Sequence, residues 1–504
     1  MRNIFRPAMI QNILVLGAGS AGLLAAITLK KKVPQLGVRL VRSSDLGVIG
    51  VGEGTTPALP HHLFNYLGLS ARQFYTRAEP TWKLGIHFLW GPRPQFDYTF
   101  THQLDARWSN LPRPHGFYSH DEFRGNDLHG ALMAEGKAFV RHPQSGGPDF
   151  GQSLFGFHVE NKKLVATLES MAAELGVTFL EGKVSGTERG PDGLAALLLE
   201  DGQRLAADFF IDCSGFRSEL LGRALAEPYL SYDRALFCDR AVIGGWDRTT
   251  EPILPYTTAE TMDAGWAWQI EHEHHINRGY VYCSQAISDD EACAEFQRKN
   301  PKAPASPRVV KFRSGRYQRV WVDNVLAIGN AAGFVEPLEA TALMVVTQQC
   351  QQFINMLDST ALTPTPTWRA LYNQLLCASF DDTRDFLALH YKLNTRLDNP
   401  FWQHARADTD LGALAPLVDF YHENGPTGAA RHLLPSERNN AGIEGYLAML
   451  VGNQTPYRAR HAATSDERLV WKNYCAAFLV QAKRGLTVAE ALALTRLPQW
   501  QWQS

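Results

Sequence analysis

The stretch Ile13-Leu14-Val15-Leu16-Gly17-Ala18-Gly19-Ser20-Ala21-Gly22-Leu23-Leu24-Ala25-Ala26-Ile27-Thr28-Leu29 decides the fold of this chain. It opens with a short apolar run typical of a strand and continues, after the glycines, with good helix formers that end at three lysines. This order predicts a strand, a tight turn and a helix. The interrupting glycines and serine argue against a signal peptide or a membrane-spanning segment.

The glycines have the spacing of a dinucleotide-binding turn. Gly17 permits the tight turn, Gly19 lets the backbone approach a pyrophosphate, and Gly22 permits close packing of helix on strand. The helix beginning near Ser20 and Ala21 offers unpaired N–H groups to the phosphates. Glycines that serve packing alone would give the same pattern. The interpretation as a dinucleotide-binding turn therefore depends on the neighbouring segments.

The context agrees with a dinucleotide site. Residues 38–41, Val-Arg-Leu-Val, read as a second strand and close a βαβ unit. The acidic residue that normally follows this strand and holds the ribose hydroxyls is replaced by Arg42. An arginine here suits the 2′-phosphate of NADP, whereas the rest of the chain favours FAD.

Composition places the chain among soluble globular proteins with a large core. It has 504 residues, 45% hydrophobic and 20% charged, with 49 Lys and Arg against 51 Asp and Glu. The charge balance gives no support to a nucleic-acid surface or a membrane anchor, so a small molecule is the expected partner. Seven scattered cysteines without a C-x-x-C pair favour free thiols in the cytoplasm over a zinc or redox site.

Four further segments carry motifs. They are Ile49-Gly50-Val51-Gly52-Glu53-Gly54-Thr55-Thr56-Pro57, Trp82-Lys83-Leu84-Gly85-Ile86, Val325-Leu326-Ala327-Ile328-Gly329-Asn330-Ala331-Ala332-Gly333 and Phe334-Val335-Glu336-Pro337-Leu338-Glu339-Ala340-Thr341-Ala342. Together with the glycine-rich turn, they resemble the flavin-dependent halogenases of the tryptophan halogenase family. The resemblance covers segments from residue 13 to about 345 and only thinly the last 150 residues.

The resemblance implies two more flavin-contacting loops. Val51, Gly52 and Glu53 match the family's G-V-G-E-A-T loop, in which Gly54 takes the place of the alanine. Gly329 and Asn330 match the place where flavin hydroxylases have Gly-Asp and contact the ribityl chain. The amide of Asn330 still donates and accepts hydrogen bonds, and the change weighs against a hydroxylase.

Lys83 is the first expected catalytic residue. Residues 82 to 90 alternate in polarity and predict one strand with Lys83 on its polar side, where a lysine is usually solvated. The family's K-x-G-I lysine instead lies at the end of a channel from the flavin, where it meets hypohalous acid. An ammonium would hydrogen-bond this species and a neutral amine would form a haloamine; the sequence leaves both open.

Glu339 is the second expected catalytic residue. The family has E-P-L-E-S-T-G here, with its second glutamate near the lysine, so Glu339 would orient hypohalous acid or take the proton from the ring. The backbone amides of Thr341 and Ala342 would contact the halide. Ala340 and Ala342 replace a serine and a glycine, and an alanine with positive φ would be strained.

The family's W-x-W-x-I-P motif appears as Trp266-Ala267-Trp268-Gln269-Ile270-Glu271. The two tryptophans share one strand face, where they either wall off the active site or serve as ordinary core residues. Two histidines that follow, His272 and His274, lack the further ligands that a metal would need, so no metal site is expected.

The last part of the chain predicts helices over residues 379–391, 413–422, 465–482 and 487–496. We expect an FAD-binding and catalytic module over residues 1–345, with insertions near 80–150 and 225–315, and a helical substrate-covering subdomain over residues 346–504. Phe100, His102, Tyr446 and Asn453 are weaker candidates for substrate contacts.

The expected fold is α/β: a Rossmann-like FAD module of the hydroxylase type with a β-sheet substrate region, followed by a mainly helical C-terminal subdomain. The expected function is a two-component halogenase that uses FADH2 from a separate NAD(P)H-dependent flavin reductase, O2, and chloride or bromide on an indole-like aromatic. A homodimer is expected from family habit. An FAD-dependent aromatic hydroxylase and a non-catalytic flavin-binding protein are the alternatives.

Overall fold

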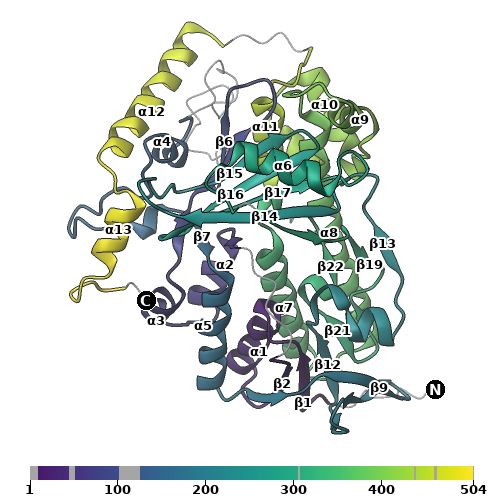
Figure 1. The fold of residues 1–504 in the computed structure, drawn as a ribbon. Helices are drawn as coiled ribbons and strands as arrows, with labels where there is room; N and C mark the ends of the chain where they lie inside the picture. Colours follow the sequence, from purple (N-terminus) through teal and green to yellow (C-terminus); the bar gives the residue numbers. More distant parts are fainter. Residues whose placement is uncertain are drawn as a thin grey trace.

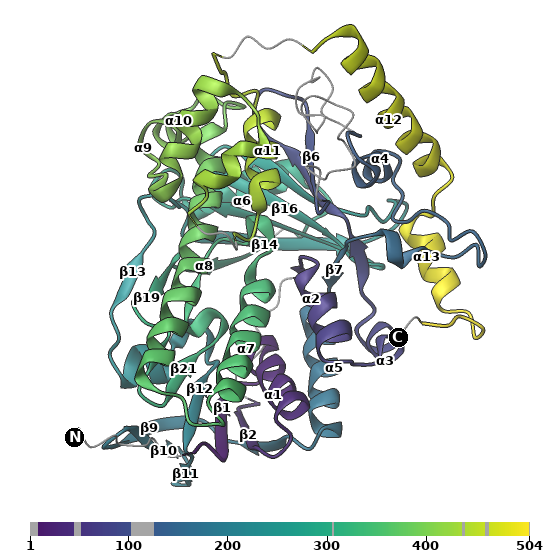
Figure 2. The ribbon, with the colours of Figure 1, turned by 180° about the vertical axis from the view of Figure 1, so that it is seen from behind.

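Two large sheets organise the chain. The computed structural model describes residues 9–44, 52–101, 125–304, 307–435, 439–458 and 463–502. Figure 1 shows the sheet that contains β1 and β2 at the bottom of the molecule and the sheet that contains β14 to β17 above it, across the middle. The long helix α8 (Pro366–Leu393) runs beside both, as the view from behind in Figure 2 also shows.

The six-stranded sheet forms the dinucleotide-binding half and confirms the predicted βαβ unit. Its order is β20-β21-β12-β1-β2-β8, parallel except for β20. Helix α1 (Ser20–Lys32) lies between α5 and α7, because the apolar side chains along its length are buried on several sides. The strands are β1 Asn12–Leu16, β2 Gly37–Arg42, β8 Thr178–Glu181, β12 Phe209–Asp212, β20 Trp321–Val322 and β21 Val325–Ala327.

The seven-stranded sheet has the order β18-β14-β17-β16-β15-β5-β6 and is antiparallel except between β15 and β5. One face packs on α8 and α11 through a cluster that includes Phe88, Trp266 and Phe386, and the other face packs on α6. The strands are β5 Gly85–Leu89, β6 Phe96–Thr99, β14 Arg240–Asp247, β15 Thr257–Met262, β16 Gly265–Glu271, β17 His275–Tyr282 and β18 Arg308–Lys311.

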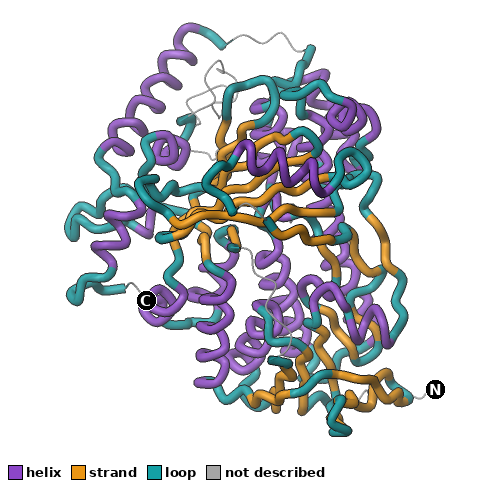
Figure 3. The backbone as a smooth tube through the Cα atoms, viewed as in Figure 1, coloured by secondary structure: helices purple, strands orange, loops and turns teal. Residues whose placement is uncertain are grey.

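Three small sheets complete the strands drawn in Figure 3. The first is β3 Glu53–Gly54, β7 Gly156–Val159 and β4 Thr81–Lys83. The second is β11 Arg204–Ala206, β10 Gly193–Leu199 and β9 Val184–Gly190, in which β10 and β11 form a hairpin around Asp201 and Gly202. The third is β13 Tyr229–Ser231, β19 Gly315–Tyr317 and β22 Gly333–Phe334.

The predicted single strand over residues 82 to 90 was wrong. β4 ends at Lys83 and pairs with β7, whereas β5 begins at Gly85 and pairs with β15 and β6. The polar positions Lys83 and His87 are buried, because both sides of this segment are covered by protein. The alternation of residue types therefore marks a buried polar site and not a face turned to solvent.

Helices dominate the remainder of the chain, as predicted for its C-terminal part. Helix α7 (Ala342–Ser359) crosses the expected boundary at residues 345 and 346 and packs on α1. The other helices are α2 Ala58–Pro60, α3 Ala71–Ala78, α4 Leu128–Ala134, α5 Asn161–Glu174, α6 Asp289–Lys299, α9 Pro400–Asp408, α10 Ala415–Asn424, α11 Gly442–Gly452, α12 Ser465–Lys483 and α13 Val488–Thr495. Within the described ranges no helix combines the length and apolar character needed to cross a bilayer.

Candidate active site

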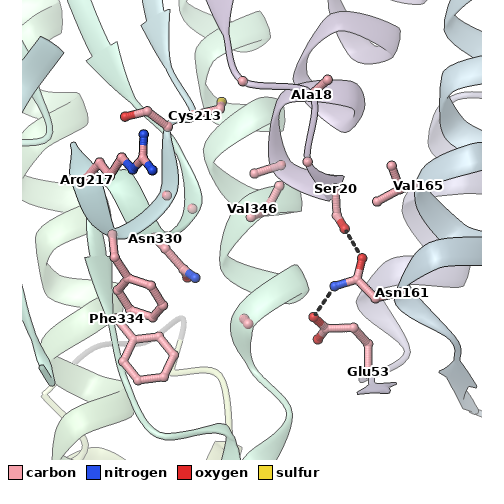
Figure 4. A pocket seen from close by; sticks show the side chains of 18 of the residues that line it. Ala18, Ser20, Glu53, Asn161, Val165, Cys213, Arg217, Asn330, Phe334 and Val346 are labelled. Carbon is pink, nitrogen blue, oxygen red and sulfur yellow. Dashed lines mark hydrogen bonds between the residues drawn. The ribbon is translucent and has the colours of Figure 1, made fainter. Parts of the chain in front are cut away.

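An open cavity of about 1210 Å³ lies at the N-terminal end of α1. Figure 4 shows Ala18 and Ser20 of the glycine-rich turn on one side and Arg217, Asn330 and Phe334 on the other. The predicted cofactor residues that line it are Gly17, Gly19, Ser20, Ala21, Arg42, Gly52, Glu53, Gly329 and Asn330. Gly22 is absent from the lining, and Val51 lies outside the described residues.

The three glycines of the turn have different environments. A Cβ on Gly17, whose φ is 107°, would lie 2.4 Å from the Cys213 carbonyl oxygen. A Cβ on Gly22 would lie 1.9 Å from the carbonyl oxygen of Gly17, whereas a Cβ on Gly19 would meet nothing within 4 Å. Gly17 and Gly22 therefore serve close packing, and the backbone at Gly19 faces open space, which fits the pyrophosphate of a dinucleotide.

Two carboxylates lie beside Arg42, although no acidic residue ends its own strand, β2. Arg42 donates to Glu169, and its Nε is 3.2 Å from an oxygen of Glu181 at the end of the neighbouring strand β8. All three side chains line the cavity. The backbone N–H of Ser44 lowers the pKa of Glu181. An ionised acid from β8 therefore stands where the dinucleotide-binding fold usually places one at the end of β2.

A chain of polar side chains crosses the cavity wall from α1 to β3. Ser20 Oγ is 3.4 Å from Asn161 Oδ1, and Asn161 Nδ2 donates to Glu53 over 3.3 Å, as the dashed lines in Figure 4 show. Burial raises the pKa of Glu53 to about 7. A carboxyl in this state is protonated in a substantial fraction of molecules at neutral pH.

Lys83 lies fully buried behind the inner end of this cavity. A Cβ placed on the cavity-lining Gly54 would be 3.6 Å from Lys83 Nζ. The ammonium lies over the Phe100 ring at 5.3 Å from its centroid and has no hydrogen-bond partner among the described residues. Burial lowers the pKa of Lys83 to about 8, and the charge of Glu339 opposes that shift. Lys83 and Glu339 therefore interact electrostatically in the folded chain.

Glu339 is buried and forms a short hydrogen bond with a histidine that sequence reasoning missed. Glu339 Oε1 lies 2.7 Å from His390 Nε2, and His390 Nδ1 lies 2.8 Å from the Phe386 carbonyl oxygen. Since a carbonyl oxygen only accepts, Nδ1 carries a proton. The contact between Nε2 and Oε1 needs a proton of its own, so Glu339 and His390 hold one between them.

Glu336, the other glutamate of this motif, is held in place by a network of hydrogen bonds. It is fully buried and accepts hydrogen bonds from Trp266 Nε1 at 2.9 Å and from the Tyr391 hydroxyl at 2.5 Å. Burial raises the pKa of Glu336 to about 7, and its two donors oppose the shift. Of the two motif tryptophans, Trp268 lines the cavity and Trp266 holds the glutamate turn.

The residues after Glu339 show where the backbone is strained. Pro337–Glu339 form a short 3₁₀ turn that ends at Ala340, whose φ is 56°. Ala342 begins α7 with negative φ, so the left-handed residue is Ala340 and not Ala342. The hydroxyl of Thr341 is buried and has no hydrogen-bond partner among the described residues. Ala340 and Ala342 both line the cavity.

The weaker substrate candidates lie in different places. Phe100 is the ring beneath Lys83. Tyr446 is fully buried on α11, packs on Phe386 and accepts from Asn439. Asn453 ends α11 and packs against Gly91. His102 lies outside the described residues.

The missed residues His390 and Tyr391 carry weak sequence signals. Both lie in a long amphipathic helix in which any histidine or tyrosine could serve the core. Their roles come from long-range packing. Among the described residues, no group of three or more His, Cys, Asp or Glu is arranged to hold a metal ion.

The comparisons with known proteins agree on one family. The family model described as tryptophan halogenase matches residues 12–465. The chain is 32% identical over 445 residues to tryptophan 7-halogenase KtzQ of a Kutzneria species, covering 83% of this chain and 82% of the relative. It is 30% identical over 439 residues to tryptophan 7-halogenase RebH of Lentzea aerocolonigenes, covering 82% of each.

A solved structure extends the likeness to the whole fold. The crystal structure of MibH, a lanthipeptide tryptophan 5-halogenase, superposes with a TM-score of 0.88 at 36% identity, over 97% of this chain and 94% of that one. Such a match includes the helical C-terminal part, where the sequence motifs are thin. The chain therefore belongs to the tryptophan halogenase family of flavin-dependent halogenases.

Proposed function

We propose that the chain is a two-component halogenase. It would use FADH2 from a separate NAD(P)H-dependent flavin reductase, O2, and chloride or bromide to halogenate an indole-like aromatic ring. The observation that carries the proposal is the burial of Lys83 directly behind the inner end of the cavity, within electrostatic reach of Glu339. A flavin held in the cavity would supply the chemistry that converts O2 and halide to hypohalous acid.

The proposed flavin-holding residues are those that line the cavity, with Gly22 supporting the turn from behind. The open backbone at Gly19 and the N-terminal N–H groups of α1 suit the pyrophosphate. Glu53 and Asn330 reach the same cavity from opposite walls. The backbone amides of Thr341 and Ala342, at the start of α7, are proposed to meet the halide, since the first N–H groups of a helix lack intrahelical partners.

Lys83 is proposed to receive the hypohalous acid. With a pKa of about 8 it is mainly an ammonium at pH 7, and its three donors are unused within the described protein. Hydrogen bonds to a charged donor are strong where water is excluded. We therefore favour the ammonium, which polarises the halogen, over the haloamine.

Glu339 with His390 is proposed to take the ring proton. When halogen adds to the ring, the carbon that receives it must lose its hydrogen as a proton. Glu339 accepts that proton only as a carboxylate, which requires His390 to carry the proton that the pair shares. The Phe386 carbonyl keeps the other imidazole nitrogen protonated and fixes the ring orientation.

The substrate is proposed to present an indole ring to Phe100 and Lys83. MibH is named as a halogenase of tryptophan in a lanthipeptide, whereas KtzQ and RebH are named as tryptophan halogenases. The structural match to MibH makes a tryptophan within a peptide the first substrate to test beside free tryptophan. A cytoplasmic location is proposed on the free thiols of six cysteines, which are Cys213, Cys238, Cys283, Cys293, Cys350 and Cys377, and a homodimer is proposed from family habit.

The test is mass spectrometry of products. The protein is incubated with FAD, a generic flavin reductase, NADH and either chloride or bromide, with indole, free tryptophan and tryptophan-containing peptides as substrates. Lys83→Met and Glu339→Gln serve as matched variants, and FAD binding is measured on each to show that the cavity is intact. We expect a halogen isotope pattern in the wild type that disappears in Lys83→Met.

The alternative outcomes are distinct. An oxygenated product that forms without halide and persists in Lys83→Met would show that the protein is an aromatic hydroxylase. Peroxide at equal rates in wild type and variants, with unchanged substrates, would indicate a flavin-binding protein without catalysis. Either result overturns the proposed halogenase mechanism.

A further inference from the structure

Three cations line the large cavity where it meets solvent. Arg217, Arg308 and Lys311 all contribute to the cavity wall and are exposed. Arg217 ends the 3₁₀ turn that follows β12, and the other two side chains belong to β18. Within the described ranges, none of the three forms an ion pair with a carboxylate. We call these three cations, together with the exposed Phe216 beside Arg217, the rim.

The other cations of the cavity wall are neutralised. Arg42 is paired with both Glu169 and Glu181. Lys183 is paired with Glu200 at 2.7 Å. Positive charge without a counter-charge therefore lies at the rim and not at the end of the cavity near β2 and β8.

The acids closest to the rim have cationic partners of their own. Glu219, which also lines the cavity, pairs with Arg223 at 3.2 Å. Asp289 lies within electrostatic reach of Lys311 but pairs with Arg240. The whole chain has a formal net charge of -2, so it does not attract anions over long distances. Any attraction for an anion at this cavity is therefore local to the rim.

Aromatic rings lie between the cations of the rim. Phe216 is 42% exposed, and its ring centroid is 5.0 Å from that of Phe334. The Phe334 ring is in turn 5.2 Å from the ring of Phe312, the residue after Lys311. All three rings line the cavity, and Figure 4 shows Phe334 on the same side as Arg217. The rim thus combines an exposed aromatic surface with unpaired positive charge.

We propose that the rim is an encounter site that captures the flavin nucleotide from solution before it enters the cavity. The inference rests on the proposed two-component function, in which reduced flavin arrives from a separate enzyme. A flavin nucleotide has a flat aromatic ring system, which fits Phe216, and negatively charged phosphates, which fit the three cations. Charge of one sign at the opening of a cleft raises the association rate of an oppositely charged ligand by about 10 to 10³-fold.

The experiment measures the association and dissociation rates of FAD. Oxidised FAD is mixed with the protein in a stopped-flow instrument, and binding is followed by the change in flavin fluorescence. Wild type is compared with the triple variant Arg217→Gln, Arg308→Gln, Lys311→Gln. We expect the association rate constant of the triple variant to be about tenfold lower at low salt, the lower end of the range for electrostatic steering, with a much smaller change in the dissociation rate constant.

The matched control removes the same total charge elsewhere. The triple variant Arg204→Gln, Arg298→Gln, Lys472→Gln changes three exposed cations that do not line the cavity. We expect its association rate constant to stay close to that of wild type. A loss equal to that of the rim variant would mean that total charge, and not the rim, governs the association rate, and it would overturn the proposal.

Salt and the aromatic ring separate the two parts of the rim. The Debye length is about 30 Å at about 10 mM salt and about 3 Å at about 1 M salt. The association rates of wild type and of the rim variant should therefore converge at high salt. Phe216→Ala should lower the association rate at both salt concentrations, because contact with an aromatic ring is not screened.

The outcomes distinguish the rim from the proposed function. An association rate of wild type that does not depend on salt, or a loss seen only in the dissociation rate, overturns the encounter site and leaves halogenation untouched. Unchanged FAD association in the rim variant, with less halogenated product when the reductase supplies the flavin, would assign the cations to an acidic surface of the reductase and also overturn it. Salt-dependent capture of FAD by a wild type that makes no halogenated product overturns the proposed function alone.

Discussion

The buried ammonium of Lys83, which has no hydrogen-bond partner among the described residues, lowers the stability of the fold. Burial lowers the pKa of Lys83 from 10.5 to about 8, so the unfolded chain binds more protons between these pH values. Stability therefore rises with pH from about 8 to 10.5 and carries the full penalty below pH 8. Lys83→Met keeps the side-chain length and removes the charge, and we expect it to raise the free energy of unfolding at pH 7 by about 2 kcal/mol.

The measurement is urea denaturation at pH 7 and pH 10. The gain from Lys83→Met should be smaller at pH 10, because the wild-type lysine is then neutral in the folded state. Lys163→Met, at a half-buried lysine with two surface ion pairs, is the control and should change stability by less than about 1 kcal/mol. A destabilised Lys83→Met at both pH values would show that the ammonium has a stabilising partner.

The pair of His390 and Glu339 acts as one unit in the proposed reaction. His390→Phe keeps the buried ring but leaves Glu339 without its 2.7 Å partner. We expect kcat for halogenation to fall about 10² to 10⁴-fold, the range assigned to a general acid or base, with little change in the KM for halide. The double variant His390→Phe with Glu339→Gln should be no slower than the worse single variant, since residues that act together are not additive.

The controls for this pair use binding and pH. His404→Phe, at an exposed histidine on α9, should leave kcat unchanged. FAD affinity should be equal in wild type and His390→Phe, because the pair does not line the cavity. Additive losses in the double variant, together with an unchanged pH profile of kcat in His390→Phe, would assign His390 to packing alone.

Local sequence patterns predicted the strands and helices better than they predicted the contacts within the candidate site. The order of β1, α1 and β2 follows from an apolar run, glycines at fixed offsets and a run of helix formers, all of which act within thirty residues. The helix after Thr487 follows from its capping box. These signals are local, so the sequence contains them in full.

The contacts of the site depend on register and long-range packing, which the sequence does not contain. The break at Leu84, which separates β4 from β5, follows from pairing with β7 in one sheet and β15 in another. Glu339 and His390 are 51 positions apart in the sequence and the whole of α7 lies between them, so only the packing of α8 brings them together. Motif resemblance selected Lys83 and Glu339 as candidates but gave no signal for His390, the partner of Glu339.

Strand β16 supports the turn that contains Glu336 and Glu339 through one hydrogen bond. Trp266→Phe keeps an aromatic ring in the core but removes the Nε1 donor to Glu336, which is left with Tyr391 as its side-chain donor among the described residues. We expect a loss of about 1 to 3 kcal/mol in the free energy of unfolding. The loss should be larger at pH 8 than at pH 6, because the pKa of Glu336 is about 7 and only the carboxylate needs the donor.

The matched variant is Trp268→Phe. Trp268 donates to Asn277, a partly exposed residue that water can reach, so its loss should cost less than that of Trp266. Chemical denaturation of both variants at the two pH values measures the difference. Equal losses without pH dependence would mean that packing of the indole rings, and not the bond to Glu336, accounts for the effect.

The hydrophobic core and the candidate site both join distant parts of the chain. We therefore expect the chain to unfold as one cooperative unit. One hydrophobic cluster joins Ile13 and Leu24 of the N-terminal βαβ unit to Phe353 of α7 and Leu492 of α13. The site takes Lys83 from β4, Glu339 from the turn before α7 and His390 from α8. Unfolding of the N-terminal βαβ unit, or of the helices that pack on it, would therefore expose a shared core and separate the site residues.

We expect a single unfolding transition in calorimetry, at a temperature where halogenation activity and near-UV circular dichroism are lost together. FAD in excess should raise that temperature, because it binds the folded chain alone. Two resolved transitions, with the lower one insensitive to FAD and the activity surviving it, would contradict this expectation. Such a result would mean that a C-terminal part melts while α8 stays against Glu339 through the contact of His390. We expect no such separation, because α8 shares buried side chains with the elements of both large sheets.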